Sequence, residues 1–90
     1  MMDRSAIPRQ KAGYETADLD GEFMIYQSAE GRAVYLNETA SLVWKLCDGQ
    51  RSVAAIEGLL GEAYPDATEL SADVESAVLK LLEHGVVELR

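Results

Sequence analysis

The sequence predicts an α+β domain with a winged helix-turn-helix-like arrangement, in which a three-stranded antiparallel sheet is followed by a three-helix bundle. Two observations predict it. Short runs of strand-forming residues separated by turn residues occupy the segment before Asn37, and apolar residues at helical spacing fill three segments after it. A length of 90 residues allows one domain with a modest core. We expect residues 1–12 to form a flexible N-terminal arm and residues 13–90 to form this domain.

The predicted sheet is a meander whose strands are separated by two turns. Asp20-Gly21 suits the positive φ angles of a tight hairpin, and the strand-forming residues Phe23–Tyr26 follow it. Ser28–Gly31 forms the second turn signal. The segment Arg32–Leu36 is then the third strand, and we expect it to pair with Phe23–Tyr26.

The first helix is predicted to begin after Asn37, whose side chain can accept a hydrogen bond from the first turn. Gly49 lies just past its end, where a left-handed residue is favoured. One apolar face follows the spacing i, i+3, i+4, i+7, and it consists of Ala40, Val43, Trp44 and Cys47.

The second helix is predicted to begin after Ser52 and to end at the Tyr64-Pro65 pair. Gly58 and Gly61 cost helix propensity, so we expect another helix to approach closely there. The expected buried face consists of Val53, Ile56, Leu59, Leu60 and Ala63.

The third helix is predicted from about Glu69 to His84, with Gly85 directly after it. Residues 86–89 follow as a short final strand or extended tail. The expected buried face of this helix consists of Val74, Ala77, Val78, Leu81 and Leu82.

The charge balance argues against nucleic-acid binding, because the chain has a net charge of −8 and phosphate binding depends on Lys and Arg. A single cysteine excludes an internal disulfide framework and a multi-cysteine zinc site. No apolar run approaches the roughly 18 residues of a membrane span, and no signal-peptide pattern is present. We therefore expect a cytoplasmic protein.

Catalytic motifs are missing from the sequence. His84 has no nucleophile nearby in the sequence, and Cys47 lies on the apolar face of the first helix, which favours a core role over a reactive thiol. Trp44 is likewise interpreted as a core residue. The sequence shows no phosphate-binding loop and no metal-ligand spacing, so we expect a non-catalytic binding protein without a cofactor.

The third strand suggests how such a protein could bind a partner. At the edge of the meander, Arg32–Leu36 would expose main-chain groups, which proteins either protect or use. An extended peptide could pair with this edge as an additional strand. A second copy of the chain could pair with it equally well and give a homodimer.

The segments "YLNETASLVWKLCDGQRSVAAI", "YP" and "DVESAVLKLLEHGVVEL" resemble the PqqD family, whose members act as recognition elements for ribosomally made, post-translationally modified peptides. The resemblance covers about residues 35–89, and its specificity comes from the order and spacing of the motifs. It implies that the leader segment of a precursor peptide pairs with the third strand beside the third helix. It further implies that the bound precursor is presented to a modifying enzyme or a leader peptidase.

Carried onto this chain, the resemblance places a peptide-binding site on the third strand and on one flank of the third helix. Helical spacing selects the flank, and Ala77 within it either leaves room for a peptide side chain or is a close-packed core residue. The candidate residues are Arg32, Ala33, Val34, Tyr35, Leu36, Asp73, Ser76, Ala77 and Lys80.

Two alternatives to peptide recognition come from the same predicted fold. A DNA-binding winged helix would use the third helix for recognition, but the predicted segment contains Lys80 as its only Lys or Arg residue among several acids. An acidic protein-interaction or homodimerisation module is the stronger alternative. The stretch "DLDGEFMIYQSAEGRAVYLNETASLVW" differs from what we expect of quinone-pathway members, so the sequence does not assign that pathway.

Overall fold

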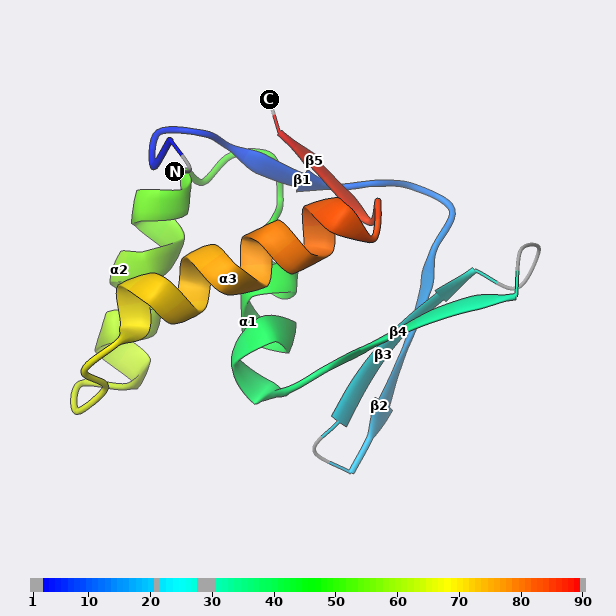
Figure 1. The fold of residues 1–90 in the computed structure, drawn as a ribbon, viewed down its shortest axis with the longest axis horizontal. Coiled ribbons are helices and arrows are strands. Elements are labelled where there is room, and N and C mark those ends of the chain that lie inside the picture. Colours follow the sequence, from blue (N-terminus) through cyan, green and yellow to red (C-terminus); the bar gives the residue numbers. More distant parts are fainter. Residues whose placement is uncertain (1–2, 21, 28–30, 90) are drawn as a thin grey trace.

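The computed structural model describes residues 3–20, 22–27 and 31–89 of the chain (Figure 1). Within them, a three-stranded sheet extends to one side of a bundle of three helices, and a second, two-stranded sheet lies across the bundle. The elements in chain order are β1 (Pro8–Gln10), β2 (Glu15–Leu19), β3 (Glu22–Gln27), β4 (Arg32–Leu36), α1 (Glu38–Leu46), α2 (Val53–Ala63), α3 (Leu70–Glu83) and β5 (Val87–Leu89).

The larger sheet has the strand order β2-β3-β4, and both pairings are antiparallel, as the sequence predicted. In the second pairing, Ile25 lies opposite Val34 and Phe23 lies opposite Leu36. These four side chains are buried on the face that meets α1, where the ring of Phe23 lies 5.6 Å from that of Trp44. The predicted turn residues Gly21 and 28–30 lie outside the described residues.

The helix boundaries follow the predicted capping residues. The Asn37 side chain accepts a hydrogen bond from the Ala40 amide at 2.8 Å, and the Ser52 hydroxyl accepts one from the Ala55 amide at 3.1 Å. Each bond satisfies an amide that has no partner within its own helix. Gly49 has a φ of +79°, so the predicted left-handed residue after α1 is confirmed.

The core lies between the sheet and the inward faces of the three helices. The predicted inward face of α2 is only partly correct, because Val53, Ile56 and Leu60 are buried whereas Leu59 is 40% exposed and Ala63 is also exposed. The apolar stripe of α2 is thus narrower than its sequence suggests.

The close helix approach predicted at Gly58 and Gly61 is wrong for Gly58, around which a side-chain carbon would meet open space. At Gly61, a side-chain carbon would lie at an ordinary contact distance of 3.7 Å from Leu70. Neither glycine is therefore explained by a tightly packed neighbouring helix.

The N-terminal segment differs from the flexible arm that the sequence suggested, because β1 pairs with β5 in an antiparallel register. The other side of β1 meets the loop after α1, where Gln10 N donates to the Cys47 carbonyl at 2.9 Å and Gly49 N donates to the Pro8 carbonyl at 3.0 Å. Pro8 is the first residue of the strand, a position that tolerates a missing donor. Both sides of β1 are thus paired within the chain.

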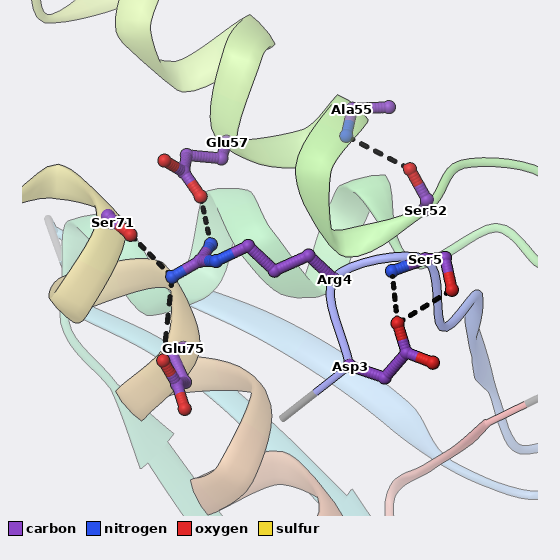
Figure 2. Close-up of polar contacts among 8 residues, drawn as sticks. All are labelled: Asp3, Arg4, Ser5, Ser52, Ala55, Glu57, Ser71 and Glu75. Atoms are coloured by element: carbon purple, nitrogen blue, oxygen red, sulfur yellow. Dashed lines mark hydrogen bonds and ion pairs between the residues drawn. The ribbon is translucent and has the colours of Figure 1, made fainter. Parts of the chain in front are cut away.

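The residues before β1 fasten this segment to α2 and α3 (Figure 2). The guanidinium of Arg4 forms ion pairs with Glu57 of α2 and Glu75 of α3, and it also donates to the Ser71 hydroxyl. The Arg4 carbonyl accepts from the Ala54 amide at the start of α2 at 3.0 Å. These contacts fix α2 and α3 relative to each other. Among the helices of the described chain, none is long and apolar enough to cross a membrane.

Candidate functional site

Two long side chains connect the edge strand β4 to the C-terminal half of the helix α3. Near the start of β4, the Arg32 guanidinium donates to the His84 carbonyl at 3.1 Å, at the end of α3. Near the end of β4, the Lys80 ammonium donates to the Tyr35 carbonyl at 3.1 Å. The two contacts link the outer edge of β4 to the C-terminal half of α3. We refer to the space along this edge as the groove.

The Lys80 contact also indicates which main-chain groups of β4 point away from β3. Successive strand residues direct their amide and carbonyl to alternate sides, and Tyr35 directs its carbonyl toward α3. We infer that Tyr35 and Ala33 present their main-chain groups along the outer edge and that Val34 faces β3. In the described part of the chain, no other strand pairs with this edge.

The side chains of β4 alternate in the same way between the two faces of the sheet. Val34 and Leu36 are buried in the core, whereas Ala33 is exposed and Tyr35 is 57% exposed. Val34 and Leu36 therefore hold the strand in place, with their side chains in the core and their main-chain groups inferred to face β3.

A hollow of about 240 Å³ continues the groove beyond the end of β4. Asp73 and Lys80 lie about 10 Å apart along α3, a distance that corresponds to seven residues of helix. The hollow therefore presents an acidic and a basic side chain on opposite parts of its helical wall. Its lining consists of Asn37, Thr39, Ala40, Asp73, Ser76, Ala77 and Lys80.

The predicted flank of α3 is brought together, since Asp73, Ser76, Ala77 and Lys80 all line the hollow. Ala77 has features of both a groove residue and a core residue, because it lines the hollow and is only 7% exposed. The predicted strand residues, Arg32–Leu36, are not among the residues that line the hollow, and they are linked to α3 through Arg32 and Tyr35 instead.

Sequence reasoning missed the contribution of α1 to this hollow. Thr39 and Ala40 line it together with the cap residue Asn37. The short junction between β4 and α1 could have indicated this contribution. Only Asn37 separates the two elements, so the first turn of α1 lies beside the end of β4.

Cys47 and His84 are the two residues that the sequence offered as candidates for catalysis, and each has an identifiable structural role. Cys47 is fully buried, and burial raises the pKa of its thiol to about 12, with a further contribution from the charge of Asp48. The thiol is therefore neutral at ordinary pH, as a core role requires. His84 contributes its main-chain carbonyl to the Arg32 contact. The described residues contain no group of three or more side chains suited to holding a metal ion.

The fold and groove together define a class of protein: a small α+β domain with an edge strand flanked by a helix. The chain belongs to the PqqD family, because the family described as "Coenzyme PQQ synthesis protein D (PqqD)" matches residues 22–87. The family resemblance given above is thereby confirmed.

Curated relatives support the same assignment along nearly the whole chain. "PqqA binding protein 1" of Pseudomonas putida is 37% identical over 90 residues, which cover 94% of each protein. "PqqA binding protein" of Pseudomonas fluorescens is 40% identical over 77 residues, covering 81% of this chain and 80% of that one. Both relatives are named for binding PqqA.

A solved structure shares the fold at low sequence identity. The structure described as "TbiB1 in Complex with the TbiA(beta) Leader Peptide" matches with a TM-score of 0.72 and 16% identity, covering 89% of this chain and 94% of that chain. At this identity the likeness concerns the arrangement of helices and strands, and it agrees with the predicted α+β fold.

Proposed function

We propose that this protein binds the leader segment of a precursor peptide and presents it to a modifying enzyme or leader peptidase, without catalysing a reaction itself. The leader adds a strand to the outer edge of β4, beside α3. The relatives named as PqqA binding proteins support the ligand class. We place this binding in the cytoplasm, where ribosomes release precursor peptides.

The observation that carries the proposal is the alignment of β4 with α3. An edge strand offers main-chain donors and acceptors to any extended peptide, and pockets beside the edge then select side chains. Here Tyr35 and Ala33 supply the inferred edge groups, and the hollow between α1 and α3 lies directly beyond them.

Tyr35→Pro tests the proposal, because proline removes the outward amide while an edge strand tolerates its ring. We would measure binding of two fluorescent probes: PqqA of Pseudomonas putida, and the tightest binder selected from displayed random peptides. Affinity should fall at least about tenfold, the equivalent of roughly 1.4 kcal/mol. Unchanged affinity in a folded variant, or no binding of either probe to the wild type, would count against the proposal.

Val34→Pro is the matched control, because its amide is inferred to face β3 and its side chain is 6% exposed. It should disrupt the sheet, as shown by circular dichroism, whereas Tyr35→Pro should keep a native spectrum.

Sedimentation of the protein alone tests whether a second copy of the chain, rather than a peptide, occupies the edge of β4. A monomer that forms a one-to-one complex with peptide supports leader binding, whereas a stable dimer that excludes peptide supports self-pairing.

A further inference from the structure

Lys80 differs from the arginines of the described chain that form ion pairs. Arg4, Arg9 and Arg51 each contact a carboxylate. The exposed Lys80 side chain instead donates to the main-chain carbonyl of Tyr35, and no carboxylate partner is found for it among the described residues. Its positive charge therefore lies at the hollow and beside the edge of β4.

A carbonyl is a neutral acceptor and occupies only one of the three donors of an ammonium group. A carboxylate would form a stronger, charge-assisted hydrogen bond. The carbonyl oxygen of Tyr35 has two lone pairs, so it can accept from Lys80 and from the amide of an added strand together. Peptide pairing and the Lys80 contact are therefore compatible, and the ammonium stays beside the path of the peptide.

The geometry of a sheet selects the peptide side chain that Lys80 would meet. Side chains of an added strand alternate between the two faces, and those on the face of Val34 and Leu36 point toward the helices. Cross-strand partners share a face, so the inward side chains lie opposite Val34 and Leu36. The one opposite Leu36 lies next to the Tyr35 carbonyl, to which Lys80 donates, and toward the hollow. A later inward side chain lies nearer to Asp73, where a negative charge would be repelled.

We propose that Lys80 is a specificity-determining residue of the groove, and that it selects peptides with an Asp or Glu side chain at the inward position opposite Leu36, next to the Tyr35 carbonyl. The inference rests on the proposed function, and it adds the charge of the ligand and its location. Asp73 then disfavours a second acid farther along the hollow, so the pair Lys80 and Asp73 also favours one direction of the bound strand.

A selection from displayed random peptides of about twelve residues, long enough to follow β4 and the hollow, tests this inference. Wild-type protein should enrich Asp or Glu at one position of the aligned binders. Lys80→Met should remove that preference, Lys80→Arg should retain it, and Lys80→Glu should enrich Lys or Arg at the same position. A wild-type binder should lose about fivefold in affinity for Lys80→Met, as expected of an exposed ion pair.

Lys11→Met provides a matched control, because it removes the same charge from an exposed residue away from the hollow. Lys11 lies between β1 and β2, where its amide donates to the Val86 carbonyl. This variant should leave the selected sequences unchanged. Binders that depend on the Tyr35 edge but show no acidic preference would overturn the role of Lys80 and leave the proposed function standing. Binders insensitive to Tyr35→Pro, or a failure to obtain any, would overturn both.

Discussion

Two strands of this protein, β1 and β4, are treated in opposite ways. β1 is paired on one side with β5 and on the other with the loop after α1, so its edges are satisfied within the chain. β4 is paired with β3 alone in the described residues, and its outer side faces α3 through the side chains of Arg32 and Lys80. β2 and β5 also pair with one strand each in the described residues. What sets β4 apart is that its outer side is linked to α3 and leads to the hollow.

The same contrast divides the surface of α3. On one flank, Ser71 and Glu75 are held by Arg4 (Figure 2). On the other flank, Ser76 and Lys80 line the hollow. The first flank fixes the helix in the bundle, and the second is left for a ligand. The account therefore predicts that substitutions on the closed side change stability and that substitutions on the groove side change binding.

The largest expected effect comes from placing proline in the closed edge. Gln10→Pro removes the amide that donates to Cys47 and the side chain that donates to the Trp44 carbonyl at 2.8 Å. We expect a loss of roughly 2–4 kcal/mol in the free energy of unfolding. Tyr35→Pro on the uncovered edge should lose less than about 1 kcal/mol. Urea unfolding of both variants makes the comparison, and equal losses would show that the two edges do not differ.

A second pair of variants separates core from groove on α3. Ala77→Trp should destabilise by roughly 1–3 kcal/mol, because Ala77 is buried and overpacking strains a core. Ser76→Trp adds the same ring to an exposed residue lining the hollow, so its stability should be nearly unchanged. It should nevertheless lower affinity for the probe peptides at least about tenfold. Normal binding by a stable Ser76→Trp protein would place the peptide outside this hollow.

Much of this fold could be predicted from the sequence because its signals are local. Asn37 and Ser52 cap their helices, and the flank from Asp73 to Lys80 follows from helical spacing alone. The β1–β5 pairing could not be predicted, because the paired residues Arg9 and Glu88 lie near opposite ends of the sequence. A three-residue strand is also too short to show an alternating pattern of apolar and polar residues. The Lys80 contact with Tyr35 likewise depends on how α3 packs.

A smaller effect is expected where Arg4 joins α2 to α3. Arg4→Met keeps part of the aliphatic contact and removes the ion pairs with Glu57 and Glu75. Because the side chain of Arg4 is 38% exposed, we expect a loss of about 1 kcal/mol in unfolding free energy. Affinity for the probe peptides should stay within about twofold of wild type. A larger binding loss would show that the closed flank of α3 controls the groove.

The last effect appears only at alkaline pH and concerns the buried thiol of Cys47. The raised pKa of Cys47 means that the unfolded chain loses this proton near pH 9 while the folded protein keeps it to about pH 12. Stability is therefore unaffected below pH 9 and falls as the pH rises through this interval. Cys47→Ala should show a shallower alkaline loss of stability than wild type. Identical pH profiles, or rapid alkylation of the native protein at pH 8, would contradict the burial of this thiol.

Amide hydrogen exchange can show whether the uncovered edge of β4 receives a peptide strand. Exchange would be followed by NMR in the protein alone and with a saturating selected peptide. The account predicts that the amides of Ala33 and Tyr35 become protected at least about tenfold on binding, while that of Val34, inferred to face β3 already, changes little. Saturating peptide that leaves the exchange of Ala33 and Tyr35 unchanged would contradict strand addition at β4.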